Sequence, residues 1–203
     1  MAQGPLPWLR PAVFTGALVP LAAILLRAAR GELGANPIAE ALNRLGLVAL
    51  VFLLLTLACT PMKPLFGWTW PARLRRMLGL FAFFYATSHV ATYAGLDQVL
   101  DVGAIAADIA KRSFILAGFL AWLLMIPLAL TSTDAMVKRL GFRRWKLLHR
   151  LAYLCAALGV VHFVLRVKAD LTEPLLYGAV LAALLVLRLV GAARGRPQRT
   201  LVE

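Results

Sequence analysis

The chain has 203 residues, of which 62% are hydrophobic and 15% are charged, and its mean hydropathy is +0.81. A soluble domain carries about 25% charged residues, so this composition excludes the ordinary soluble class and favours a membrane protein. The net charge of +13 would suit a nucleic-acid-binding protein. The basic residues border long apolar runs instead of forming one solvated face, so no nucleic-acid partner is expected.

Apolar runs set the predicted architecture, because a helix of about 20 residues crosses a bilayer. The predicted transmembrane helices cover residues 11–29, 44–61, 76–96, 112–132, 147–166 and 173–192. A signal peptide is the alternative for the first run, but Arg27 and Arg30 stand where small residues should precede a cleavage site. The connections are short, so we expect an all-α integral membrane bundle of six helices, with residues 1–203 forming one domain.

The distribution of charge predicts the orientation, because cytoplasmic loops are rich in Lys and Arg. With both termini in the cytoplasm, the inner segments hold 15 of the 22 basic residues and 2 of the 9 acids. The inner count includes Arg194, Arg196, Arg199 and the acid Glu203. The whole net charge of +13 then lies on the inner side. The basic balance is therefore explained by membrane topology and contact with anionic lipid.

The predicted loops contain helix start and stop signals. Asn36-Pro37 should interrupt the first outer loop, and Pro71 suits the first turn of a helix. Residues 132–134 read Ser-Thr-Asp and offer N-caps. The following AMVKRLG predicts a short interfacial helix that ends at Gly141.

The chain has three histidines, His89, His149 and His162, and all of them lie within predicted membrane helices. Ionisable side chains are costly inside a membrane, so their presence there indicates a function. A structural alternative is a histidine hydrogen-bonded to a neighbouring helix. The two cysteines, Cys59 and Cys155, lie in apolar runs without CxxC or zinc-ligand spacing, and we interpret them as core residues.

The histidine spacing predicts a pair at one depth. His89 follows Arg76 by 13 residues and His162 follows His149 by 13, on two helices that run in the same direction. At about 1.5 Å per residue, His89 and His162 lie about 20 Å from the inner ends. Two such imidazoles can bind a haem iron from both sides, whereas zinc would need further ligands. A proton relay stays open.

Arginines lie at the inner end of the third predicted helix. A guanidinium suits a haem propionate or a flavin phosphate and is a poor iron ligand, so Arg75 or Arg76 is a candidate partner for such an anion. Positions 13 residues apart differ by about 140° around a straight helix, so Arg75 is closer than Arg76 to the face of His89. Anchoring by the positive-inside rule is the alternative for both arginines.

Aromatic residues flank His89 at helical spacing, with Tyr85 four residues before it and Tyr93 four residues after it. Such a stripe fits a cofactor pocket, but it also fits ordinary helix packing or an interfacial aromatic belt. Both interpretations stay open at this point.

Several segments together resemble the MsrQ (YedZ) family, within the ferric-reductase-like transmembrane superfamily, from about residue 30 to residue 190. The segments are GANPIAEALNRLG, LACTP, RRMLGLFAFFYATSHVATY, KRSFILAG, PLALTS, LGFRRWKLLHRLAYL, and HF followed by VK. The resemblance implies a b-type cytochrome of the bacterial inner membrane that carries electrons to MsrP. That partner is a periplasmic molybdopterin enzyme that reduces methionine sulfoxide in proteins, so the sulfoxide chemistry would lie on the partner.

The resemblance also implies a set of cofactors and ligands. The family's histidines fall on His89, His149 and His162, and Arg76 stands where the larger superfamily has a fourth histidine. One or two haem b groups are therefore expected. The family is described with quinol as the electron source, and also with a cytosolic flavin reductase and FMN.

Two other functions remain as alternatives. A metalloreductase would reduce ferric chelates outside, but it normally carries a fused flavin and nicotinamide domain. A non-redox transporter would use the histidines as a proton path. The chain has no GxGxxG after a strand, no P-loop and no CxxCH, so neither nucleotide binding nor covalent haem is indicated.

Overall fold

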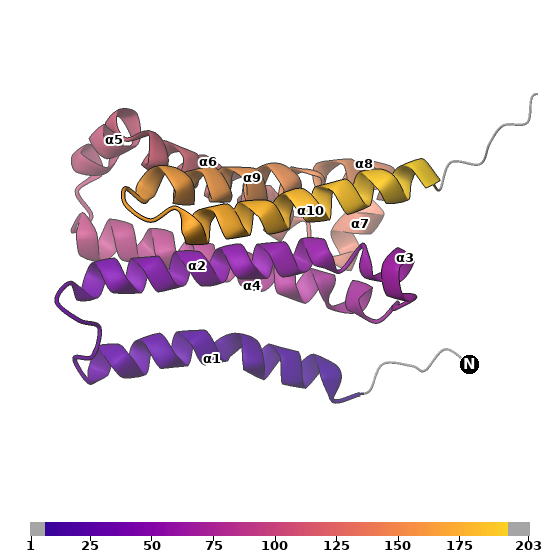
Figure 1. The fold of residues 1–203 in the computed structure, drawn as a ribbon, viewed down its shortest axis with the longest axis horizontal. Coiled ribbons are helices and arrows are strands. Elements are labelled where there is room, and N and C mark those ends of the chain that lie inside the picture. Colours follow the sequence, from indigo (N-terminus) through magenta and orange to yellow (C-terminus); the bar gives the residue numbers. More distant parts are fainter. Residues whose placement is uncertain (1–6, 195–203) are drawn as a thin grey trace, which may run out of the picture.

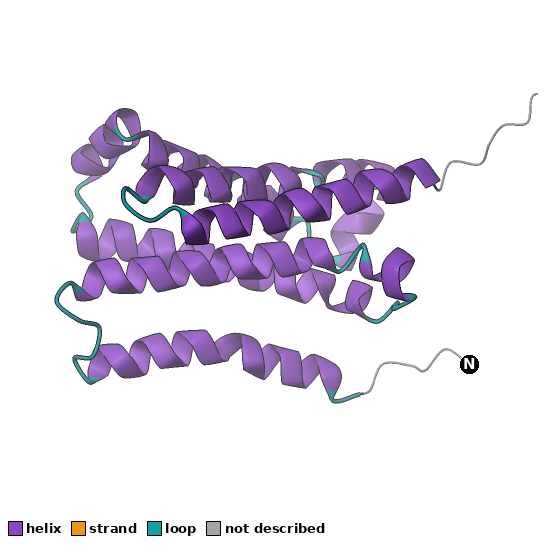
Figure 2. Ribbon diagram, in the orientation of Figure 1, coloured by secondary structure: helices purple, strands orange, loops and turns teal. Residues whose placement is uncertain are grey.

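The computed structural model describes residues 7–194 of the chain, with side chains as far as Gly191. Within this range it contains helices and loops and no strand (Figure 2). The predicted all-α class is therefore confirmed for the described residues. The side chains of Arg194, Arg196, Arg199 and Glu203, which belong to the predicted inner charge, lie outside the described part.

Long helices lie side by side along one axis of the molecule (Figure 1). They are α1 (Leu9–Ala29), α2 (Pro37–Ala58), α4 (Pro71–Thr92), α6 (Ser113–Leu130), α9 (Leu151–Arg166) and α10 (Thr172–Arg194). Shorter elements connect them: α3 (Met62–Phe66), the π-helix η1 (Tyr93–Asp97), α5 (Val102–Lys111), α7 (Asp134–Leu140) and α8 (Phe142–Leu148). Each of the six predicted runs thus corresponds to a long helix, although their ends differ.

Within the described residues, five helical runs are long and apolar enough to cross a membrane. They are α1, α2, α6, the run Phe142–Arg166 that contains α8 and α9, and α10. Large apolar side chains such as Val19, Leu130 and Leu189 are exposed on these helices, as expected for contact with lipid. The remaining long helix, α4, carries three arginines in its first two turns and Thr, Ser and His in its outer half, and these residues lower its hydropathy. A sixth span therefore stays a prediction.

The predicted signals at Pro71 and around α7 are confirmed, whereas Asn36-Pro37 starts a helix instead of interrupting a loop. Asn36 caps α2 by accepting a hydrogen bond from the amide of Ala39, and Pro71 begins α4. Thr133 caps α7 in the same way, and that helix stops before Gly141, whose φ is +76°. Local capping chemistry thus fixed these ends.

The helix α2 begins at Pro37, before the predicted start of the second span at residue 44. The added turns contain Glu40 and Arg44, which form an ion pair of 2.6 Å at positions i and i+4. This pairing lets charged residues continue the helix beyond its apolar part. The predicted fifth span is also interrupted, because a turn at His149 and Arg150 separates α8 from α9.

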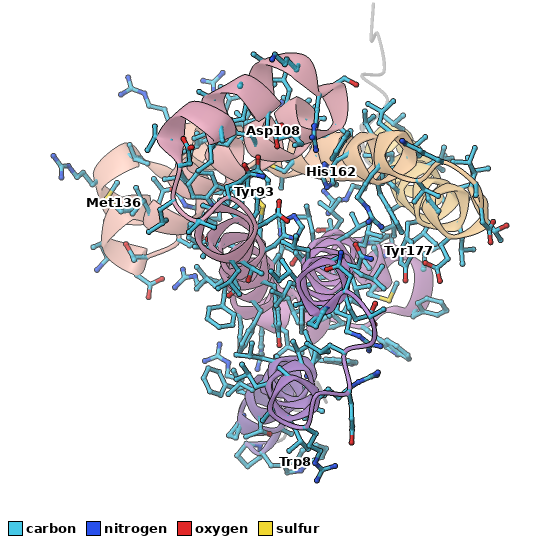
Figure 3. All side chains as sticks on the ribbon, turned by 90° about the vertical axis from the view of Figure 1, so that its left-hand side faces the viewer. Trp8, Tyr93, Asp108, Met136, His162 and Tyr177 are labelled. Atoms are coloured by element: carbon cyan, nitrogen blue, oxygen red, sulfur yellow. The ribbon has the colours of Figure 1, made fainter. Side chains whose placement is uncertain are left out.

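Two helix pairs form the centre of the bundle, α2 with α4 and α6 with α9, and these make the most extensive contacts between long helices. In the first pair, the ring of Phe52 stacks on those of Tyr85 and Phe81, with centroids 5.6 and 5.7 Å apart. The view along the helices places His162 in the interior and Trp8, beside α1, at the edge (Figure 3). The described bundle therefore surrounds a histidine with its two central helix pairs.

Candidate functional site

The structure brings His89 of α4 and His162 of α9 together. Their ring centroids are 6.1 Å apart and their ring planes make an angle of 85°. Both side chains are partly buried. The prediction that these two histidines lie at the same depth is confirmed by this contact.

Each of the two imidazoles is held by a main-chain carbonyl of a neighbouring helix. The Nδ1 atom of His89 lies 2.9 Å from the carbonyl oxygen of Leu42 on α2, and that of His162 lies 2.6 Å from the carbonyl oxygen of Phe114 on α6. A carbonyl oxygen can only accept, so both Nδ1 atoms carry the proton and donate. In a neutral imidazole, this leaves the Nε2 lone pair free to bind a metal ion.

The pair fits the axial ligands of a haem iron. Two imidazoles that share one metal ion, each through a bond of about 2 Å, have ring centres about 6 Å apart, which agrees with the 6.1 Å observed. No group of three or more His, Cys, Asp or Glu side chains that could hold a metal ion occurs among the described residues. A closed zinc site therefore finds no support in this part of the chain, and a metal that needs only two axial side chains fits better.

His149 lies apart from this pair, in the turn between α8 and α9. Its ring packs on that of Trp145, with centroids 4.1 Å apart, and its Nε2 lies 3.1 Å from the hydroxyl oxygen of Thr131. That hydroxyl donates to the carbonyl oxygen of Pro127 at 2.6 Å, so it accepts from Nε2–H of His149. The imidazole of His149 is therefore held through Nε2, the opposite arrangement to that of His89 and His162.

The two candidate arginines point to different places. Arg76 forms an exposed ion pair of 2.6 Å with Asp134 of α7. The hydrogen bond and the charge of Arg76 hold the pKa of the Asp134 carboxyl below its usual value. Arg75 is half-buried instead and lies within electrostatic range of Arg188 and Cys59. No carboxylate lies within 4 Å of Arg75 among the described residues.

Comparison with known proteins decides the family. A family model described as "Ferric reductase like transmembrane component" matches residues 45–160. A relative from Rhodospirillum rubrum is 54% identical over 187 residues, which cover 92% of this chain and 90% of the relative. Another relative, from Deinococcus radiodurans, is 50% identical over 202 residues, which cover 98% of this chain and 100% of the relative. Both are named protein-methionine-sulfoxide reductase heme-binding subunit MsrQ.

This chain belongs to the MsrQ family. The resemblance that its segments indicated is thus confirmed, and the chain is a membrane protein of the ferric-reductase-like transmembrane class. No solved structure matches it.

From the sequence, Gly118 is one of several glycines in the predicted membrane helices that could let helices or a porphyrin approach closely, whereas Gly46 and Arg166, which also lie near the histidine pair of this MsrQ-family chain, were missed. Gly46 and Gly118 lie against the imidazoles, and Arg166 donates a hydrogen bond to the side-chain oxygen of Asn43. Arg166 had a sequence signal, because it follows His162 by four residues and so shares its helix face. Gly46 had none, and the sequence did not indicate that Gly118 meets an imidazole, since these contacts depend on which helix packs against which.

Arg188 was also missed, at the opposite end of the bundle. Its Nη2 atom donates to the carbonyl oxygen of Leu57 and to the hydroxyl of Thr60, both at 2.8 Å. Its guanidinium lies over the ring of Tyr153, 4.7 Å from the centroid. In the sequence, Arg188 is only one basic residue near the inner end of the last predicted helix, because nothing there indicates that α10 packs against α2 and α9.

Proposed function

We propose that this chain is a b-type cytochrome subunit of the bacterial inner membrane that carries electrons to a periplasmic MsrP-like molybdopterin enzyme, which reduces methionine sulfoxide in proteins. The contact between His89 and His162, with both Nε2 atoms free, is the observation that carries this proposal. The names of the relatives support it, since they describe heme-binding subunits of a methionine sulfoxide reductase.

In this proposal, His89 and His162 would hold a haem b between α4 and α9 through their Nε2 atoms. The carbonyl groups of Leu42 and Phe114 keep both imidazoles in the Nδ1–H tautomer. Haem supplies a one-electron iron couple when it is bound. The residues themselves do no proton chemistry here, and their task is to orient two lone pairs and to keep the site within an apolar bundle.

A second, inner centre is proposed at His149, which ligates or supports it, so that the chain would hold one or two haem groups. Arg75 or Arg76 would pair with a haem propionate or with an FMN phosphate. Two features of Arg75 support its assignment: its side chain is half-buried, and no carboxylate lies within 4 Å of it among the described residues. A guanidinium in this situation suits an anionic group of a cofactor. Electrons would enter on this side from quinol or from a cytosolic flavin reductase.

The proposed topology has six spans, with α4 as the one that hydropathy does not identify, and residues 1–203 as a single domain. It is supported by the antiparallel course of α4 along α2, and by the start of α1 and the end of α10, which lie at the same end of the bundle (Figure 1). An even number of crossings returns a chain to the side from which it starts. The positive-inside rule makes that side cytoplasmic.

The visible spectrum of the purified protein tests the proposal. We expect a low-spin b-type spectrum that is lost in His89→Ala and in His162→Ala. Ser88→Ala is the matched control, because Ser88 lies beside His89 and bonds only within its own helix, to the carbonyl oxygen of Phe84. A purified wild-type protein without haem would favour the proton-path alternative. Reduction of ferric chelates without any transfer to MsrP would favour the metalloreductase alternative.

A further inference from the structure

Two glycines lie directly beneath the paired imidazoles. A Cβ atom at Gly46 would lie 3.2 Å from Nδ1 and 3.3 Å from Cε1 of His89. A Cβ atom at Gly118 would lie 2.7 Å from Nδ1 and 3.0 Å from Cε1 of His162. Contacts this short form only if the imidazole or the helix backbone moves. Each imidazole therefore occupies space that the side chain of any residue other than glycine would fill at position 46 or 118.

The same arrangement occurs twice. Gly46 follows Leu42 by four residues, and Gly118 follows Phe114 by four residues. Residues four apart lie on the same face of a helix. One turn of α2 and one turn of α6 therefore each offer a carbonyl oxygen that accepts from Nδ1, next to a bare backbone against which the ring lies. We call each of these turns, residues 42–46 and 114–118, an imidazole seat.

We propose that Gly46 and Gly118 are positioning residues, which set the rotation of the His89 and His162 rings and so keep Nδ1–H on the carbonyl and Nε2 free for the metal. This inference rests on the proposed function for its ligand. A methyl group at position 118 would push the ring of His162 away from the Phe114 carbonyl. The effect should be larger at Gly118 than at Gly46, because the former contact is closer.

The test compares the variants Gly118→Ala and Gly46→Ala with alanine variants of two other glycines in the same helical bundle. Gly79→Ala and Gly159→Ala are the controls, because their added Cβ atoms would meet only Thr56 or Leu50, at an ordinary distance of 3.5 Å. All four substitutions replace glycine by alanine within a helix and favour that helix equally. Any difference between the two groups therefore reports contact with the imidazoles.

Two measurements on the full-length purified protein separate this inference from the proposed function. Nitrogen-15 NMR of labelled histidine reports the tautomer without haem, and the low-spin visible and EPR spectra report the ligated state. We expect Gly118→Ala to shift the His162 tautomer and to lose or alter the low-spin signals, with both controls unchanged. An unchanged tautomer and spectrum in Gly118→Ala would overturn the inference while leaving haem binding intact. A shifted tautomer in a protein that never binds haem would support the seats and overturn the proposed function.

A separate observation concerns Arg166. Its guanidinium crosses from α9 to α2 and donates to the side-chain oxygen of Asn43, the residue after Leu42. Arg166 is partly buried, and no carboxylate lies within 4 Å of it among the described residues. A guanidinium that has only a neutral acceptor retains its full charge and free donors. We infer that Arg166 and Asn43 form a carboxylate site at the outer edge of the histidine pair, which takes a haem propionate.

The midpoint potential of the bound haem tests this second inference, which also depends on the proposed function. Arg166→Gln should lower the potential, because a cation near the iron favours the reduced form, and Arg166→Lys should restore part of it. Arg44→Gln is the control, since Arg44 follows Asn43 and is already paired with Glu40. Arg166→Gln should also weaken the retention of haem, and this loss should vanish in protein reconstituted with haem dimethyl ester, which has no carboxylate for the guanidinium to bind. An equal loss of retention with the ester, or no loss with haem, would overturn the assignment.

Discussion

The hydroxyl of Tyr85 donates a hydrogen bond of 2.7 Å to the carbonyl oxygen of Ala17. It also accepts one of 3.1 Å from the amide of Leu21, so the hydroxyl of an α4 side chain is inserted into the backbone ladder of α1 next to Pro20. Tyr85 is fully buried. Of the two interpretations of the aromatic residues around His89, the structure therefore supports helix packing for Tyr85.

Removal of this hydroxyl should loosen α1 without changing the histidine pair. Tyr85→Phe leaves the Ala17 carbonyl and the Leu21 amide without their partner, or forces α1 to close its own ladder, at a cost of about 1–3 kcal/mol. Thermal unfolding in detergent should show a lower Tm with an unchanged haem spectrum. Tyr177→Phe on α10, where the ring packs on Phe163, is the control. A loss of haem in Tyr85→Phe would contradict the placement of Tyr85 outside the site.

Loss of His149 should affect only the inner end. His149→Ala is expected to retain the low-spin spectrum of the outer centre and to slow reduction from the cytoplasmic side. Thr131→Val should produce a weaker effect of the same kind, because it removes the oxygen that holds Nε2 of His149. Stopped-flow reduction with a quinol analogue measures both rates. A structure of the haem-loaded protein with His149 against lipid, away from any cofactor, would rule this role out.

The two inner arginines should behave differently. Arg75→Gln removes a half-buried cation and is expected to slow reduction from the inner side several-fold. Arg76→Gln removes an exposed ion pair to Asp134, and exposed pairs contribute little. Reduction rates and haem content of both variants, compared with Asp134→Asn, provide the measurement. A larger effect of Arg76→Gln than of Arg75→Gln would assign the anionic group to Arg76 instead.

Electrons should leave from the face formed by the outer loops around residues 30–43, 97–111 and 167–173. The loops are short, so the contact with MsrP should be transient and bury less than about 1,200 Å². Vesicles of known orientation, reduced and then given oxidised MsrP on one side at a time, test the direction. Reoxidation of haem only from the arginine-rich side would overturn both the topology and the partner.

Acidic residues of the second outer loop should contribute little to that contact. Asp101 caps α5, and Asp108 accepts from the hydroxyl of Tyr93 and pairs with Arg112. Their charges are thus already engaged within the chain. We expect the rate of haem reoxidation by MsrP to change less than about threefold in Asp97→Asn, whose charge is exposed, measured at two salt concentrations. A steep loss of rate in this variant would instead identify Asp97 as a steering group for the partner.

The sequence by itself determined the features that depend on neighbours along the chain. Runs of apolar residues predicted the long helices, and capping residues such as Thr133 and Gly141 predicted where α7 starts and stops, because a helix end is satisfied by groups a few residues away. The common depth of His89 and His162 also followed from counting residues, since the rise per residue of a helix is constant.

Only the tertiary structure decided what surrounds the histidines. The imidazole seats consist of a main-chain carbonyl and an absent side chain, neither of which has a distinctive residue pattern, and they exist only because α2 packs on α4 and α6 packs on α9. In the same way, Arg75 faces the bundle while Arg76 reaches Asp134, because the rotation of α4 about its axis is set by its neighbours. Contacts between helices far apart in sequence follow from how their surfaces fit, and no local pattern encodes that fit.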